Sequence, residues 1–307
     1  MASLRANFAD LLTPGFIKIF DDGYNFKAPT SVMEKVFNVD SSEKDSEKVS
    51  AITGFGYPVL TSEGGTIDYE DPVQMYDTTY THLKYTKGFK VSRELVEDDL
   101  YNVIKGVPKA LGMAFRRWQE RSAAQVFNRA FNSSYLGGDS EELASTSHDR
   151  SDGGTAQSNA SSTGLTLSEA NLETAIIAFR GQLDDKGMRI DVFPDTLVVP
   201  IDLRKTARLI VESPSRQGTA DNDKNIYHNE FKVLDWIYMD RNTTHWFLVD
   251  SSQKQLQWYW RVKPEFKQDD SYDTDMALYK ARARWSNGWN DWRGVWASQG
   301  DGAAYSG

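Results

Sequence analysis

The stretch Ser92–Asn132, SRELVEDDLYNVIKGVPKALGMAFRRWQERSAAQVFNRAFN, decides how the rest of the chain can be arranged. Apolar residues, with one serine among them, recur in it at steps of three and four: Val96, Leu100, Val103, Val107, Leu111, Phe115, Trp118, Ser122 and Val126. This spacing places one stripe along one side of a helix. Ser92 is expected to cap the first turn, and Pro108 is expected to kink the helix near Gly106.

A continuous helix over this stretch would be roughly 60 Å long, because each helical residue adds about 1.5 Å. That length exceeds what a compact domain usually needs. Periodicity alone leaves two interpretations open. The helix is either a kinked core helix of an ordinary domain or the spine of a plate-shaped subunit.

The composition limits the class of protein. The chain has 307 residues, enough for one large domain or two ordinary ones. Its mean hydropathy is -0.57, and no apolar run approaches the length needed to span a membrane. The N-terminus lacks the pattern of a signal peptide. The absence of cysteine excludes disulfide and thiolate chemistry and suits a reducing cytoplasm.

The net charge of -9 argues against a protein that binds nucleic acid by neutralising phosphates. It does not argue against a surface that only encloses nucleic acid.

Residues Met1–Ser50 are predicted to form an arm. One short amphipathic turn is expected from Leu4, Phe8, Leu11 and Leu12. Pro14 and the glycine after it should end that turn. The charged segment Asp40–Ser50 is typical of a flexible loop. Because the apolar residues of the arm are scattered, the body or a neighbouring subunit must bury them.

Residues Ala51–Val91 are predicted to form a long β-hairpin. Its outgoing strand is expected at Ile52–Leu60 and its return strand at Thr78–Val91, where apolar residues alternate. The expected tip, Thr61–Tyr76, contains a Gly-Gly pair and a proline, which are turn signals. A hairpin is marginally stable alone in water, so the body or a neighbour must hold it. The alternative is two strands of a larger sheet.

The second half of the chain is expected to mix helices and strands, which makes the fold class α+β. A polar loop at 137–164 precedes a helix that starts from a capping box at Thr166–Glu169. A second helix is expected to open at Pro200. Strands are predicted at Thr196–Val199, Phe231–Ile237, His245–Asp250, Leu256–Val262 and Ala277–Trp285. The conformation of Trp285–Trp296 stays open, and the tail 301–307 is expected to be disordered.

No catalytic signature is present. Phosphate-loop, zinc-protease, nucleophile-elbow and dinucleotide motifs are all missing, and the four histidines have no ligand spacing. A calcium site could be built from Asp269, Asp270, Asp273 and Asp275, although an ordinary acidic turn is favoured. We expect no metal and no cofactor. Nine tryptophans together with acidic residues also suit a carbohydrate-binding surface.

Three segments resemble the major head proteins of Mu-like and related tailed phages. They are EDDLYNVIKGVPKAL at Glu97–Leu111, TADNDKN at Thr219–Asn225 and SNGWNDWRGVWAS at Ser286–Ser298. The predicted order of elements is also similar, and the resemblance covers nearly the whole chain. It implies the Hong Kong 97-type capsid fold, which tailed-phage shells share with encapsulins.

The resemblance implies a division of the chain into named parts. These are an N-terminal arm at 1–50, an extended hairpin or E-loop at 51–91, a peripheral domain with the spine helix at 92–186, an axial domain at 187–255, returning peripheral strands at 256–300 and the tail at 301–307.

The implied function is that of a non-catalytic major capsid protein. It would self-assemble into pentamers and hexamers of an icosahedral head that encloses double-stranded phage DNA without reading its sequence. We expect the acidic balance to let DNA lie against the wall without adhering. A basic inner face would contradict this expectation.

The resemblance also implies partners and a location. A portal, possibly a decoration or cement protein, and a separate scaffolding protein are expected, because no long scaffolding segment precedes the arm. No membrane partner is expected. Assembly would take place in the host bacterial cytoplasm, and the protein would then reside in the virion.

Subunit contacts are expected at three places. The arm supplies Phe8, Phe16 and Phe20. The hairpin supplies Phe55, Tyr57, Glu63, Asp68, Tyr69 and Glu70. The axial domain supplies Arg216, Asp221, Asp223 and Lys224.

Some capsids of this fold carry an isopeptide bond between a loop lysine and a neighbour's asparagine. The expected tip here contains no lysine, and Lys84 and Lys87 lie towards the hairpin base. We therefore predict no covalent cross-link. Two alternatives to the capsid function stay open, an encapsulin-like compartment for protein cargo and a carbohydrate-binding or carbohydrate-active protein.

Overall fold

The computed structural model describes residues 6–26, 30–72, 74–92, 103–215, 223–271 and 276–305. The helices are α1 (Ala6–Asn25), α2 (Met33–Val36), α4 (Val103–Asn128), α5 (Glu169–Arg180), the 3-10 helix η2 (Ile201–Leu203) and α6 (Arg204–Val211). The strands are β1 (Asn38–Ser41), β2 (Ser46–Ile52), β3 (Gln74–Thr81), β4 (Leu83–Ser92), β5 (Thr196–Pro200), β6 (Lys232–Trp236), β7 (Trp246–Val249), β8 (Leu256–Ser271), β9 (Met276–Trp289) and β10 (Val295–Ser298).

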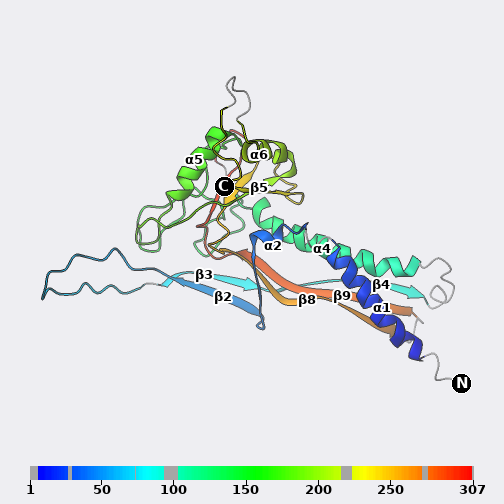
Figure 1. Cartoon of the computed structure of the whole chain (residues 1–307). Coiled ribbons are helices and arrows are strands. Elements are labelled where there is room, and N and C mark those ends of the chain that lie inside the picture. Colours follow the sequence, from blue (N-terminus) through cyan, green and yellow to red (C-terminus); the bar gives the residue numbers. More distant parts are fainter. Residues whose placement is uncertain are drawn as a thin grey trace.

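The long strands β8 and β9 form the centre of a four-stranded sheet in the order β1-β8-β9-β4. Helix α4 lies along this sheet, and α1 crosses α4 (Figure 1). Alternate residues of β9, among them Tyr279, Ala283 and Trp285, are buried. One side of the strand therefore supplies core, as the period of two in a strand requires.

Two glycines allow α1 and α4 to pack closely. A Cβ atom on Gly23 would lie 2.3 Å from the carbonyl oxygen of Lys109, and a Cβ on Gly112 would lie 2.2 Å from that of Phe20. Only glycine fits at such an approach of two backbones. Helix α1 continues through Pro14 and the following glycine, where the sequence predicts an end.

The second sheet has the order β10-β7-β5-β6 and carries α5 and α6 in the upper part of Figure 1. Every residue of β5, β7 and β10 is buried. Such continuous runs are typical of strands that are covered on both faces. A second hydrophobic core therefore forms here, around Phe179, Trp246 and Trp296.

The predicted hairpin differs from the observed one. Its strands are β2 and β3, which pair from Ser46 with Thr81 to Ile52 with Gln74. The expected outgoing strand Ile52–Leu60 is wrong, since 53–72 contains no strand. Glycine and proline in TGFGYP disfavour a strand there. The return strand is divided at His82, and β4 pairs with β9 instead.

Several other boundaries need correction. Strands β1 and β2 occupy part of the predicted arm, including its charged segment. Ser92 pairs with Met276 as the last residue of β4, so it does not cap the long helix. Residues 93–102 lie outside the described ranges. Helix α5 is capped by Ser168 and not by Thr166 of the expected capping box, and it ends before Gly181.

The tail was expected to be disordered, but residues 301–305 are ordered against the body. The Tyr305 hydroxyl donates to the carbonyl oxygen of Ala144 at 3.0 Å and also bonds the Glu142 carboxylate. Its ring lies 6.1 Å from that of Phe131. A tyrosine gains both apolar contact and a buried hydrogen bond in this place.

The polar loop at 137–164 is fixed by His148, which is fully buried. Its Nδ1 lies 2.7 Å from Asp139 Oδ2, and its Nε2 lies 3.0 Å from Asn159 Oδ1. The ring stacks on Trp292 at 4.4 Å. A loop with few apolar residues thus gains a polar core of its own.

His245 is expected to make stability depend on pH. Burial lowers its pKa from 6.5 to about 4, and its ring lies 4.9 Å from that of Phe131. The folded state favours the neutral ring. Stability from this group is therefore present above pH 6.5 and is lost as the pH falls from 6.5 to about 4.

The loss should be on the order of 2 kcal/mol, allowing for partial exposure of the ring. Urea denaturation of the wild type and of His245→Leu over this pH range measures it, because leucine cannot titrate. Equal losses in both proteins would show that other groups cause the effect.

Candidate assembly surface

The segment 53–72, here called the distal loop, projects from β2 and β3 at the left of Figure 1. Its apolar side chains are exposed. The exposed fraction is 61% for Phe55, 74% for Tyr57, 85% for Tyr69 and 99% for Leu60. Singly exposed apolar residues are ordinary, but a contiguous set marks a surface that another molecule covers.

Glu70 holds the base of the distal loop in place. Its Oε2 accepts a hydrogen bond from the backbone N–H of Gly56 at 2.7 Å, across the loop. Its Oε1 lies 2.5 Å from Lys186 Nζ, on the turn that follows α5. Both contacts lower the pKa of the Glu70 carboxyl below 4.5. The bond to Lys186 has the larger effect, and the bond to the N–H of Gly56 has the next largest.

The turn that carries Lys186 is itself fixed. The side chain of Asp184 accepts from the backbone N–H groups of Lys186 and Met188 at 2.9 and 2.8 Å. Gly187 has φ of 76°, a left-handed conformation that favours glycine. The turn therefore presents Lys186 on a rigid support.

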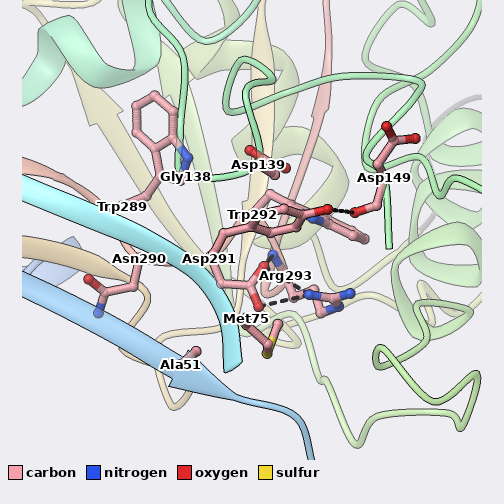
Figure 2. Close-up of a pocket in the computed structure, with 11 residues that line it drawn as sticks. Ala51, Met75, Gly138, Asp139, Asp149, Trp289, Asn290, Asp291, Trp292 and Arg293 are labelled. Atoms are coloured by element: carbon pink, nitrogen blue, oxygen red, sulfur yellow. Dashed lines mark hydrogen bonds and ion pairs between the residues drawn. The ribbon is translucent and has the colours of Figure 1, made fainter. Parts of the chain in front are cut away.

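A small hollow separates the hairpin base from the body (Figure 2). Ala51 and Met75 line it from the strands, and Arg293 lines it from the turn after β9. Arg293 pairs with Asp291 at 2.9 Å and with the buried Asp185 at 3.3 Å. Tyr76 donates to the carbonyl oxygen of Asp149 at 3.4 Å. These contacts join the hairpin base to two loops of the body.

The predicted contact residues fall into three groups. In the distal loop, Phe55, Tyr57, Glu63, Asp68 and Tyr69 are exposed and Glu70 is half-buried in its ion pair. Leu60 and Ile67, which are not among the predicted contact residues, are exposed too. Their signal was the same apolar character that selected Phe55.

In the arm, Phe16 and Phe20 are buried inside the subunit, beside Tyr279, Phe115 and Phe266. They are core residues of this chain, so of the two expected ways to bury the apolar residues of the arm, the body of the same subunit covers these two. The side chain of Phe8 lies outside the described residues.

In the expected axial region, Arg216 and Asp221 lie outside the described residues. Asp223 and Lys224 are exposed, and the backbone of Lys224 forms an isolated antiparallel β-bridge with that of Ser215. The structure thus brings together only the candidates of the distal loop.

The tryptophans do not form a sugar-binding surface. Seven of the nine are buried, and only Trp118 is exposed, at 44%. Within the described ranges, no group of three or more His, Asp or Glu residues could hold a metal ion. No described helix has the length and apolar character required to cross a membrane.

Comparison with known proteins gives the family. The sequence pattern of a family described as phage capsid protein matches residues 76–298, most of the chain. The chain belongs to the phage capsid protein family. Membership implies a structural, non-enzymatic role, and this capsid protein forms the icosahedral shell of a bacteriophage particle. No curated protein matches the sequence.

Solved capsids are similar in fold to this capsid protein. The capsid of a native GTA particle is 12% identical with a TM-score of 0.59, over 87% of this chain and 89% of that chain. The bacteriophage JBD30 capsid is 16% identical with a TM-score of 0.58, and the match covers 68% of this chain and 91% of that chain. A chain of Microbacterium phage Oxtober96 is 11% identical with a TM-score of 0.52, over 84% of both.

The contact of Glu70 predicts how the distal loop of the capsid protein responds to acid. Because its pKa is lowered, the ion pair is present above pH 4.5 and is lost as the pH falls further. The loop should then move more freely. Since the chain has no cysteine, a dye on Ser62→Cys labels the loop alone.

We expect the anisotropy of the dye to fall below pH 4.5 in the wild-type background and to be low at every pH in Glu70→Gln. Lys44→Gln, which removes an exposed ion pair elsewhere, is the control. An acid response that persists unchanged in Glu70→Gln would contradict the assignment.

Proposed function

We propose that this protein is the major capsid protein of a tailed phage and assembles as pentamers and hexamers in the Hong Kong 97-type manner. The observation that carries the proposal is the distal loop. It exposes apolar residues that its own subunit does not cover, so a neighbouring copy would bury them. Repeated contacts of this kind close into rings, and rings close into a shell.

The parts of the proposed fold map onto the observed elements. The extended hairpin comprises β2, the distal loop and β3. Helix α4 is the spine helix, and it forms the peripheral domain with the sheet around β8 and β9. The axial domain contains α6 and strands β5, β6 and β7 of the second sheet, and β10 joins that sheet from the segment expected to return to the peripheral domain. The segment before β1 is the arm.

The proposed particle contains further components. A separate scaffolding protein, a portal and a decoration protein would join the shell, which would assemble in the host bacterial cytoplasm. One similar solved structure is described as a JBD30 capsid decorated with minor capsid protein trimers, at 17% identity and a TM-score of 0.55. That likeness supports decoration as a proposal for this shell.

Electron microscopy after size-exclusion chromatography tests the proposal. The protein is expressed alone and together with neighbouring phage proteins. Closed shells, rings or tubes are expected in at least one of these samples. A monomer at all concentrations in both samples would contradict the proposal. DNA inside mature particles would separate a phage head from a compartment with protein cargo.

The proposed shell is held without covalent cross-links. The distal loop contains no lysine, so it has no amine to form an isopeptide bond. Boiled and denatured particles should therefore give a single band of monomer size on a gel. A ladder of multiples would contradict this prediction.

A further inference from the structure

Three hollows with shared lining residues lie beside α4, the edge strand β4 and α6, and together they are called the trough. The largest has a volume of about 680 Å³ and lies between β4 and α4. It shares Arg117 and Tyr238 with the second hollow, which shares Ile201 with the third. The lining thus continues from the first sheet across α4 to α6.

Cationic side chains clearly outnumber acidic ones along this trough. Some of them are neutralised. Arg121 lies 3.4 Å from Asp240, and Arg208 lies 3.3 Å from Asp235. Others are not. Lys84, Lys87, Arg117 and Lys205 are exposed, and no described residue forms an ion pair with any of them.

This distribution is unexpected in a chain of net charge -9. Cations without partners create a positive potential that attracts a polyanion. The trough is open to solvent, and exposed cationic side chains lie along it. A continuous chain of phosphates can contact successive cations along such a surface. A folded acidic protein would instead require a larger apolar interface core.

We infer that the basic trough contacts the phosphates of packaged double-stranded DNA and forms part of the inner wall of the shell. The inference rests on the proposed function, which supplies DNA as the enclosed polyanion. Contacts of this kind fix no base sequence. The inference replaces the expectation that the acidic balance lets DNA lie against the wall without adhering.

Binding of the purified full-length subunit to a short fluorescent DNA duplex tests the inference by anisotropy. Lys87→Gln/Arg117→Gln/Lys205→Gln removes three unpaired cations of the trough. The slope of log affinity against log salt should fall by about one for each lost contact. The affinity should fall roughly a hundredfold at about 0.1 M salt.

The matched control is Lys254→Gln/Lys263→Gln/Lys280→Gln. It changes the net charge equally, at exposed lysines that do not line the trough. Its slope should equal that of the wild type. Equal losses in both triple variants, or no binding of DNA by the wild type at low salt, would overturn the inference.

A polyglutamate competitor identifies the alternative partner. If the wild type binds polyglutamate through the trough and does not bind DNA, the trough receives an acidic protein segment and the inference is wrong. Shell formation by all three proteins is followed separately by electron microscopy. A wild type that forms shells but shows no trough-dependent DNA binding would refute only the inference. Absence of shells from the wild type, both alone and together with neighbouring phage proteins, would refute the proposed function.

Discussion

Tyr69→Ala should raise the concentration at which shells form by roughly thirtyfold or more, while the isolated subunit keeps its stability. Tyr69 is 85% exposed in the distal loop. Its truncation therefore removes little from the folded subunit, within about 0.5 kcal/mol. A tyrosine at the centre of an interface commonly contributes about 2 kcal/mol or more to association. Each 1.4 kcal/mol or so changes an equilibrium about tenfold, which gives the expected shift.

The measurement pairs two readouts on the same samples. Thermal unfolding reports the subunit, and electron microscopy over a concentration series reports the shell. The control is Ile177→Ala, which removes another exposed apolar side chain, at 64%, from α5. Unchanged assembly in Tyr69→Ala, or an equal defect in both variants, would show that the distal loop is not a principal contact.

The strands at the centre of the fold could be predicted because burial determines their pattern. Residues of β9 alternate between core and surface, and β5 is a continuous apolar run. Strand β8 extends to Ser271, although the sequence indicated an end near Val262. The later part of β8 pairs with β9 from Glu265 to Ser271, whereas β1 pairs only with Gln257–Trp260 on the other edge. Pro264 is tolerated at an open edge.

The contact residues were harder to predict because periodicity does not say which molecule covers an apolar side chain. Phe16 and Phe55 are both aromatic residues in segments that lack a complete apolar face. The first is buried against Tyr279 in its own subunit, and the second is 61% exposed. Only the tertiary structure separates these two cases.

The basic trough could not be predicted because net charge averages over the whole surface. Lys87 and Arg117 are thirty residues apart in sequence and belong to different elements. They meet only when β4 packs beside α4. Likewise, no sequence pattern connects Glu70 with Lys186, whose ion pair joins the distal loop to the body.

Arg293→Met should destabilise the subunit by about 3–5 kcal/mol, the cost of leaving a buried charge without its partner. Asp185 is 3% exposed and lies 3.3 Å from Arg293. The Arg293 Nε also donates to the carbonyl oxygen of Leu183 at 2.8 Å. Its loss should loosen the turn that presents Lys186 to Glu70, so the distal loop should gain mobility as well.

A double-mutant cycle separates the ion pair from general damage to the core. Asp185→Leu/Arg293→Met removes both charges and keeps apolar volume, so it should recover much of the stability that Arg293→Met loses. Asp291, the other partner of Arg293, has a side chain that is 21% exposed and can be hydrated. Urea denaturation gives the free energies of unfolding, and a dye on Ser62→Cys reports the loop. Additive losses in the double variant would mean that the two side chains contribute independently, and the pair would then not be what holds the turn.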